Sequence, residues 1–387
     1  MLRIFVVSFF LYFSFTFSFA QEQESLVIEE IIVNADYRLS DLNDIPSSVI
    51  ILDETLIQNR NAQHLEEILL NAPNVNFSSG SSRARFFQIR GIGERGQFSE
   101  PLNSSVGVII DGIDFSGIGN ASMLYDIDQV EVFLGPQGTR YGSNALAGLI
   151  SLQSKAPTKD LSYGLKLESG DYNSNGLGGY LSGPLSERFS YRISAQQIKS
   201  DGFNMNRFLN DETNTRNERV VRGKINGELL DDVELNLTAS TIKLNNGYDA
   251  FSLNNDRDTL SDQPGSDIQD SELLSAKITV SRFKHFTFDT LLGYGDSHAE
   301  YSYDEDWVYD GFHPWGYSST DQYNRDRSTG STEFRFTSSE DGKIFFDTTD
   351  WVFGFYYLGQ EVNLERIYTF LSQDFISKYD TKRLAIY

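Results

Sequence analysis

The chain has 387 residues, of which 39% are hydrophobic and 13% aromatic, and it contains no cysteine. The lack of cysteine excludes disulfide-stapled domains, thiolate metal sites and thiol nucleophiles. Because 55 acidic residues outnumber 32 basic ones, the net charge is −23. This balance argues against a nucleic-acid partner, since non-specific binding of nucleic acid relies on Lys and Arg to neutralise phosphates.

The first twenty residues have the pattern of a secretory signal peptide. Arg3 precedes an apolar run over residues 4–19, and Ser-Phe-Ala at 18–20 is followed by the polar residues 21–24. This pattern predicts cleavage after Ala20. An uncleaved membrane anchor is the alternative, but the run is short for a span of roughly 20 residues. Export without cysteine is typical of a periplasmic or outer-membrane protein.

Residues 21–157 have a mixed pattern that predicts a small α+β domain. Apolar residues near helical spacing predict one helix over Thr55–Leu70, with Pro73 shortly after its end. Short apolar runs predict the strands of this domain, at residues 48–52, 106–110, 130–134 and 146–152.

After Pro157 apolar and polar residues alternate, so each predicted strand has one apolar and one polar face. Short turns, at 186–188, 230–232 and 282–285, alternate with long polar loops, at 202–215, 246–269 and 296–323. This sorting predicts a transmembrane barrel. A soluble β-sandwich is the alternative. The expected strands lie at 162–170, 174–185, 189–200, 216–229, 233–244, 270–281, 286–294, 324–337 and 348–358, and a further strand begins at about 381.

About ten strands cannot enclose a domain of more than a hundred residues, because a lumen of that width needs roughly 22 strands. Either the first domain lies outside a small closed barrel, or the chain is an N-terminal piece of a larger one. The last residue falls within a predicted strand, which favours the second interpretation. We then expect an open, curved sheet of nine or ten strands with the first domain against its concave polar face.

Three segments resemble motifs of one known family. The sequence VEVFLGPQGTRYGSNALAG at residues 130–148 closely resembles the VEVLRGPQGTLYGRNALGG segment of TonB-dependent outer-membrane receptors. QIRGIG at 88–93 and GVIIDG at 107–112 are similar to two further segments of that family. The resemblance runs in family order over residues 26–157, and the barrel pattern follows it.

The resemblance implies an α+β plug domain followed by an antiparallel transmembrane β-barrel, incomplete here with about 9–10 of an expected 22 strands. The implied divisions are a signal peptide at 1–20, a periplasmic tail at 21–36, the plug at 37–157 and a partial barrel at 158–387. It also implies an outer-membrane location, a multi-pass β-barrel in contact with lipid, and transport driven by the inner-membrane TonB protein.

The segment after the signal peptide is similar to the TonB box. Its residues are Ile28, Glu29, Glu30, Ile31, Ile32 and Val33. An extended segment of this kind can add as a strand to the sheet edge of a partner. The alternative is an ordinary first strand of the plug.

Other residues are expected to seat the plug in the barrel. In the family an arginine at the position of Arg90 pairs with barrel glutamates, and a second arginine occupies the position that is Leu134 here. The family places those glutamates in the second half of its barrel, so Arg90 is expected to lack that partner in this chain. The expected seating residues are Arg90, Gly91, Gly135, Pro136, Gly138 and Gly142.

The expected ligand site lies on the plug apex, about residues 78–97, and on the long loops. Arg83, Arg85 and Arg95 form a basic patch suited to an anionic ligand such as a ferric siderophore. Ion pairing between plug and barrel is the alternative for these arginines. Aromatic rings could stack on a ligand or pack the loop itself; they include Tyr301, Trp307 and Trp315.

The sequence favours energy-coupled uptake of a scarce ligand, most of all a ferric siderophore or another iron complex. The alternatives are uptake of cobalamin or a carbohydrate, and a passive porin-like barrel. An enzyme is not expected, because the chain contains neither GxSxG nor HExxH. The four histidines are scattered, so no metal site is expected, and no cofactor is implied.

Overall fold

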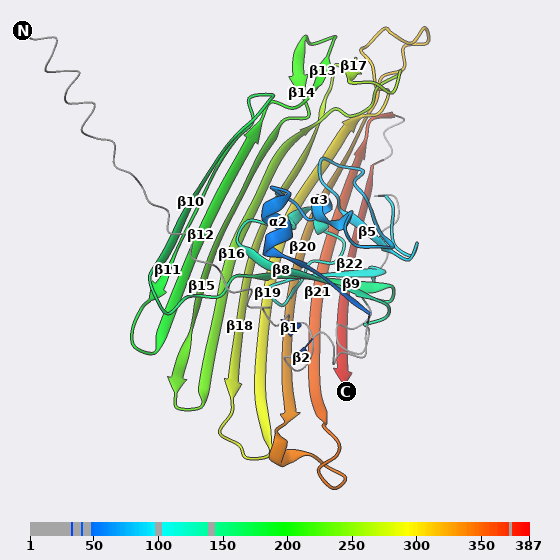
Figure 1. Ribbon diagram of the computed structural model, residues 1–387. Coiled ribbons are helices and arrows are strands. Elements are labelled where there is room, and N and C mark those ends of the chain that lie inside the picture. Colours follow the sequence, from blue (N-terminus) through cyan, green and yellow to red (C-terminus); the bar gives the residue numbers. More distant parts are fainter. Residues whose placement is uncertain (1–31, 34–39, 42–47, 97–102, 138–143, 371–373) are drawn as a thin grey trace, which may run out of the picture.

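The structure, a computed structural model, describes residues 32–33, 40–41, 48–96, 103–137, 144–370 and 374–387. A small α+β domain, here called the plug, spans the described residues from 48 to 156. It lies against one face of a large sheet, here called the wall (Figure 1). Among the described residues, no helix has both the length and the apolar character needed to cross a bilayer.

The plug is built around a mixed five-stranded sheet in the order β3-β8-β9-β6-β7. Strands β6 and β9 run parallel, and the other neighbours run antiparallel. The buried side chains of β8 and β9, Val130, Val132, Ile150 and Leu152, pack with Leu65, Ile68 and Leu69 to form its core. The plug elements are β3 (Val49–Asp53), α2 (Glu54–Asn59), α3 (Glu66–Leu69), β4 (Val75–Ser78), β5 (Phe86–Ile89), β6 (Val106–Ile110), β7 (Ile113–Asp114), η2 (Gly119–Ala121), β8 (Ile127–Leu134) and β9 (Gly148–Ser154).

The prediction of a single helix over Thr55–Leu70 is wrong. The structure has two short helices, and α2 begins at the cap residue Asp53, whose carboxylate accepts a hydrogen bond from the Leu56 amide at 2.8 Å. Between the helices, the Leu65 amide donates to the Ser122 carbonyl at 3.1 Å, and the Leu124 amide donates to the Gln63 carbonyl at 2.9 Å. These long-range backbone bonds replace helical ones, so tertiary pairing overrides the helical periodicity.

The wall is one antiparallel sheet of ten strands in the order β10-β11-β12-β15-β16-β18-β19-β20-β21-β22. Within the described residues β10 and β22 form its two edges and do not pair with each other, so the expected open sheet is confirmed. The strands are β10 (Ser162–Ser169), β11 (Asn175–Pro184), β12 (Phe189–Ser200), β15 (Arg216–Leu230), β16 (Val233–Tyr248), β18 (Gly265–Val280), β19 (Phe286–Asp304), β20 (Thr320–Ser338), β21 (Val352–Tyr368) and β22 (Phe375–Ile386).

The two faces of the wall differ in polarity. Apolar side chains exposed on the outer face include Leu165, Leu167, Ile193, Leu274, Leu292 and Phe353. The inner face carries buried polar side chains, among them Arg192, Gln196, Arg222, Ser271 and Arg327. Aromatic rings gather on the outer face near the short turns, where Phe283 stacks on Phe286 at 4.7 Å and Phe288 lies 4.8 Å from Phe336. This arrangement is typical of a lipid-facing barrel wall with an interfacial aromatic girdle.

Several strands extend farther at the long-loop end than the apolar alternation predicts. Strand β19 continues to Asp304, although its outer positions beyond Tyr294 carry Asp296, His298 and Glu300. Backbone pairing therefore continues where the outer face is no longer apolar. Tyr301, expected in a long loop, consequently lies in β19, where it is buried against Tyr248 at a ring distance of 5.1 Å.

Three loops at this end contact one another. They are loop A (201–215, with β13 Asn204–Asn206 and β14 Asp211–Thr213), loop B (249–264, with β17 Asp258–Thr259) and loop C (305–319). Strands β14, β13 and β17 form one small sheet that joins loops A and B (Figure 1). Phe208 of loop A stacks on Tyr309 of loop C at 4.6 Å, and Phe251 of loop B stacks on Trp307 at 5.0 Å.

Candidate functional site

The seam between plug and wall is held by buried ion pairs. The most enclosed is the Arg83 cluster, which comprises Arg83, Glu66, Glu67, Glu218 and Asn246. Arg83 lies between α3 and the wall and donates to both carboxylate oxygens of Glu218 on β15, at 2.8 and 2.6 Å. Its third nitrogen donates to Glu66 at 3.0 Å and to Glu67 at 2.9 Å. Since the side chains of Arg83 and Glu218 are 1% and 0% exposed, their pairing is shielded from solvent.

The pKa values of plug groups in this cluster follow from its charges. Burial would lower the pKa of Arg83, but Glu218, Glu66 and Glu67 together raise it. Burial would raise the pKa of Glu66, but His64 and Arg83 hold it below its usual value. The fully buried His64 has a lowered pKa, because desolvation and Arg83 outweigh the opposing influence of nearby carboxylates. Burial beside the cluster therefore favours the neutral form of the His64 imidazole.

Elsewhere along the seam the signs are reversed, because the wall supplies cations to acids of the plug. Arg192 of β12 donates to Asp126 at 2.8 Å. Arg222 and Lys224 of β15 lie 3.4 and 3.5 Å from the two carboxylate oxygens of Asp111.

Asp111 responds to this environment as a buried, paired carboxylate. Burial would raise the pKa of Asp111, but Lys224 and Arg222 keep it below its usual range. Ser154 adds hydrogen bonds from its backbone amide at 3.0 Å and from its hydroxyl at 2.7 Å.

A fourth wall cation, Arg327 of β20, holds the turn that follows β7. Arg327 donates to the Ser116 carbonyl, donates to the Asp114 carbonyl at 3.3 Å, and lies 3.5 Å from the Asp114 carboxylate. The Asp114 carboxylate also accepts from the Asn144 side chain at 2.8 Å.

Arg90, the expected seating arginine, lies elsewhere. Arg90 and Gly91, with φ of 54° and 81°, form the centre of a tight turn in which Ile89 and Ile92 exchange backbone hydrogen bonds of 2.9 and 3.0 Å. Positive φ at both central positions is typical of a type I′ turn. The Arg90 side chain is exposed, and no ion pair to it occurs within the described residues. Its role in seating stays a prediction.

The remaining seating residues are only partly described. Gly135 has φ of 138°, in the region that favours glycine, directly before Pro136. Gly138 and Gly142 lie outside the described residues. At Gly148 the backbone approaches closely, because a Cβ there would lie 2.3 Å from the Phe133 carbonyl oxygen.

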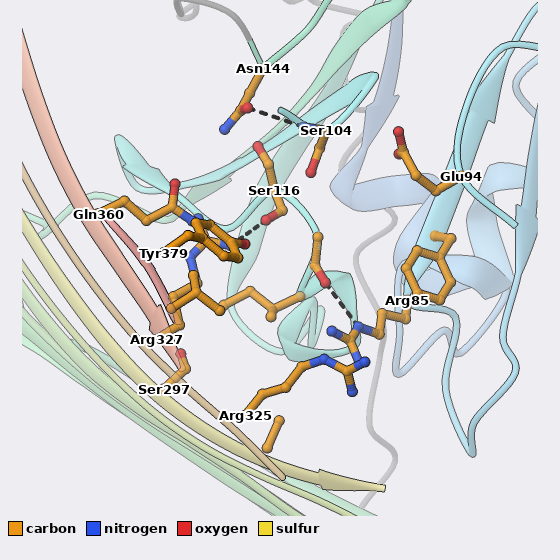
Figure 2. A pocket seen from close by; sticks show the side chains of 15 residues that line it. Arg85, Glu94, Ser104, Ser116, Asn144, Ser297, Arg325, Arg327, Gln360 and Tyr379 are labelled. Carbon is orange, nitrogen blue, oxygen red and sulfur yellow. Dashed lines mark hydrogen bonds between the residues drawn. The ribbon is translucent and has the colours of Figure 1, made fainter. Parts of the chain in front are cut away.

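A small pocket, here called the apex pocket, lies between the plug and strands β19–β22. It has a volume of about 60 Å³. Arg85 of the plug and Arg325 of the wall point toward the same part of it (Figure 2). The Arg85 guanidinium also donates to the Gly117 carbonyl at 2.9 Å. The buried Oε1 atom of Gln360 has no hydrogen-bond partner among the described residues. The pocket thus presents three guanidinium groups, the carboxylate of Glu94 and an unused acceptor.

Of the residues expected to contact a ligand, Arg85 alone lines the apex pocket. Arg83 is buried in its cluster and pairs with the wall, as the alternative of ion pairing between plug and barrel predicts. Arg95 is exposed. Trp307 and Trp315 lie in loop C, with exposed fractions of 38% and 77%. No observation tests whether these residues bind a ligand.

The sequence reasoning missed the wall residues of this pocket. Arg325, Arg327, Gln360 and Tyr379 lie on strands whose inner positions recur every second residue. Arg325 and Arg327 both fall within the expected strand 324–337, and its phase places them on one inner face. Strand phase does not show which inner side chains line a pocket, because that depends on where the plug lies.

Most of the expected TonB box lies outside the described residues. Its last two residues form β1 (Ile32–Val33), which pairs antiparallel with β2 (Ser40–Asp41). In the described parts of the chain, no three His, Asp or Glu side chains gather closely enough to hold a metal ion.

Comparison with known proteins agrees with this architecture. Residues 41–149 match the TonB-dependent receptor plug domain family. A ferric enterobactin receptor of Pseudomonas aeruginosa, PirA, is 28% identical over 186 residues, which cover 43% of this chain and 25% of that protein. The vitamin B12 transporter BtuB of Vibrio vulnificus is 25% identical over 195 residues, which cover 49% of this chain and 31% of that protein. The chain thus spans about a quarter to a third of these relatives.

Among solved structures, the ferric yersiniabactin uptake receptor FyuA of Yersinia pestis has a TM-score of 0.73 at 15% identity. The match covers 88% of this chain and 61% of FyuA. At this identity the likeness shows the fold alone. It extends well beyond the plug and into the wall.

Removing the wall carboxylate of the Arg83 cluster should weaken the seating of the plug. Glu218→Gln keeps the shape but removes the most buried counter-charge of Arg83 and leaves it only Glu66 and Glu67, so we expect a loss of about 3 kcal/mol, at the low end of the range for a broken buried pair. Hydrogen exchange at the Ile68 and Leu69 amides measures this free energy of plug opening. The control is Glu361→Gln, which breaks an exposed pair with Lys378 and should cost less than about 1 kcal/mol. Equal losses in both variants would contradict the role of the cluster.

Plug opening should become easier in mild acid because of His64. Its pKa is lower in the folded state than the ordinary value of 6.5. The stabilisation is therefore complete above pH 6.5 and is lost as the pH falls through the folded-state pKa. Glu66 and Asp111, also lowered, add a loss only below about pH 4. Hydrogen exchange between pH 7 and 5 should show the first loss in the wild type but not in His64→Gln. The exposed His298→Gln should behave like the wild type, and a loss that persists in His64→Gln would refute this assignment.

Proposed function

We propose that this chain, a member of the TonB-dependent receptors by its plug domain and its fold, serves the energy-coupled uptake of a scarce ligand across the outer membrane. The observation that carries the proposal is a plug of this family, matched over residues 41–149, seated by buried ion pairs against the inner face of a ten-stranded wall. TonB-dependent receptors are transporters and not enzymes, so the hydrolase alternative is set aside.

A ferric siderophore or another iron complex is the ligand class that the apex pocket favours. Arg85, Arg325 and Arg327 line it, and guanidinium groups bind carboxylate and other anionic oxygens strongly. A volume of about 60 Å³ admits one arm of a chelate and not a whole one. The relative PirA, named for ferric enterobactin, supports this ligand class.

The segment Ile28–Val33 is proposed as the contact with TonB. Its described residues, Ile32 and Val33, are extended, and their pairing is with a strand of only two residues, β2. So short a ladder can be exchanged for the edge of a partner's sheet, where main-chain hydrogen bonds supply the affinity. The rest of the segment is argued from the sequence alone.

One other ligand class has specific support. The relative BtuB is named for vitamin B12, and its identity to this chain, 25%, is close to that of PirA. A carbohydrate has no comparable support. A passive porin is disfavoured, because the buried ion pairs of the seam hold the plug inside the curve of the wall.

Deleting residues 28–33 should abolish uptake, because it removes the proposed TonB contact and leaves the plug and wall intact. The measurement is growth of the host on single sources: ferric enterobactin, a ferric hydroxamate, a ferric carboxylate chelate or vitamin B12. A control deletion of equal length, residues 21–26, should grow like the wild type. Growth on an iron chelate that survives the box deletion would favour a passive barrel, and box-dependent growth on vitamin B12 alone would overturn the iron assignment.

Replacing an apex arginine should weaken binding of the chelate that supports growth. Arg85→Gln and Arg325→Gln each remove one charge-assisted hydrogen bond, which contributes about 1.5–3 kcal/mol, so each should raise Kd about tenfold or more. Titration of intact cells with the radiolabelled chelate measures this change. The control is Arg219→Gln, whose side chain is exposed on β15 of the same wall. Unchanged affinity in both apex variants would exclude the pocket as the ligand site.

A further inference from the structure

A second and larger cavity, here called the inner cavity, lies between the plug and the wall. It has a volume of about 500 Å³ and is lined by the plug around Asp111 and Asp114 and by inner-face residues of β15 to β21. Its polar lining includes Lys224, Thr238, Ser275, Lys277, Ser331 and Glu333. This volume falls in the range of small-molecule sites, whereas the apex pocket does not. Its mixed charges suit a hydrated polar solute.

The apex pocket and the inner cavity share Ser116 and Asn144 in their linings, so the two spaces adjoin at these residues. Asp114 closes the boundary: it accepts from Asn144 at 2.8 Å and from the Ser116 amide at 2.8 Å. Arg327, 7% exposed, reaches from β20 to the same carboxylate and to the Ser116 carbonyl. A wall cation thus holds a plug turn across the boundary between the two spaces.

The turn that closes the boundary lies at the edge of the plug sheet. Strand β7 is an edge strand that pairs with β6 through only two residue pairs, and the Phe115 amide adds a hydrogen bond to the Val108 carbonyl at 2.8 Å. Gly112 and Gly117, with φ of 86° and 82°, bracket the segment 113–116. Glycines in this region can absorb large backbone changes. Because Ile113 and Phe115 pack in the plug core, the segment can move only by withdrawing these two side chains from it.

The wall residues opposite this segment have small side chains or none. Four successive inner positions of β19 are Gly293, Gly295, Ser297 and Ala299. Gly293 lines the inner cavity, and Ser297 and Ala299 line the apex pocket. A Cβ at Gly295 would lie 3.2 Å from Ile113 Cγ2, so the segment rests directly on the wall backbone. Moving it away would open a continuous path along β19.

We propose that the apex pocket and the inner cavity are successive chambers of one path for a hydrated polar solute, and that the contact of Asp114 with Arg327 and Asn144 is the gate between them. The gate is shut at rest, because Ile113 and Phe115 are buried and Asp114 is fully bonded. The inner cavity then acts as a transit site on the periplasmic side of the gate. This proposal rests on the uptake function proposed above.

Because these 387 residues contain no cysteine, an introduced thiol is the only one in this chain, which allows a direct test in the outer membrane. A single Ser275→Cys places a thiol on β18 in the inner cavity. The probe is fluorescein maleimide, added to intact porin-deficient cells. With the gate shut, labelling should be slow. Asp114→Ala or Arg327→Ala removes a charge-assisted bond, so either should raise the labelling rate about tenfold.

The matched control is Arg192→Ala in the same Ser275→Cys background. It breaks another buried plug-to-wall ion pair, with Asp126, whose residues do not line the inner cavity. If Asp114 and Arg327 form the gate, the labelling rate of this control should stay within twofold of the rate of Ser275→Cys alone. Equal acceleration by Arg192→Ala and Arg327→Ala would mean general loosening of the plug and would overturn the proposal. Unchanged labelling in both gate variants would overturn it as well.

A disulfide between the segment and the wall, here called the lock, tests the same gate during transport. Ile113→Cys with Gly295→Cys brings two thiols within disulfide reach, since the Cβ-to-Cγ2 distance is 3.2 Å. Oxidised, this variant should take up ferric enterobactin or vitamin B12, whichever supports box-dependent growth, at least tenfold more slowly, and reduction should restore the rate. Its control, Ser266→Cys with Ser302→Cys, links β18 to β19 without touching the plug, because these hydroxyls lie 3.0 Å apart.

The two proposals fail in different ways. Rapid transport by the oxidised lock would overturn the gate while leaving uptake intact. Absence of box-dependent growth on any compound would overturn the uptake function, and the maleimide labelling would still decide whether the gate exists.

Discussion

The structure depends on one electrostatic constraint: a buried charge on the inner face of the wall must have a partner, and the plug provides it. Removing a charge from water costs several kcal/mol unless a counter-charge and hydrogen bonds replace the solvent. Arg192, Arg222 and Arg327 each meet a plug acid or carbonyl, while Glu218 meets Arg83. Because these contacts lie on three different wall strands and have opposite signs, they define one orientation of the plug and penalise others.

The sequence predicts the wall well because its signal is local and repeated. The expected bounds of β12, residues 189–200, coincide with those in the structure, since every second residue faces the apolar side. The prediction fails where that rule stops. Beyond Tyr294 the outer positions of β19 become polar, although the strand stays paired with β20. The alternation rule therefore predicts a loop at Tyr301, where the structure has a strand. The helix over 55–70 fails for a different reason, because backbone groups near Leu65 bond to a segment almost sixty residues away.

The sequence predicts what kind of contact holds the plug against the wall, but not which residues make it. A basic patch at the plug apex was visible, but which arginine is buried depends on pairings across 135 residues of sequence, as between Arg83 and Glu218. Local chemistry did contain one clue, because the glycine at 91 suits the positive φ of a tight turn, and the turn leaves the side chain of Arg90 exposed. The pocket arginines of β20, Arg325 and Arg327, lie within the expected strand 324–337, so their shared inner face follows from strand phase, but their place in a pocket depends on where the plug lies.

The contacts among loops A, B and C have a consequence for the mouth of the molecule. The stacks Phe208 on Tyr309 and Phe251 on Trp307 join loop C to the other two, and the β13 to β17 pairing joins those two to each other. Displacing one of these loops alone would break a ring stack or the small sheet, so the three loops are mechanically coupled. A large partner that grips one of them from outside therefore restrains the other two.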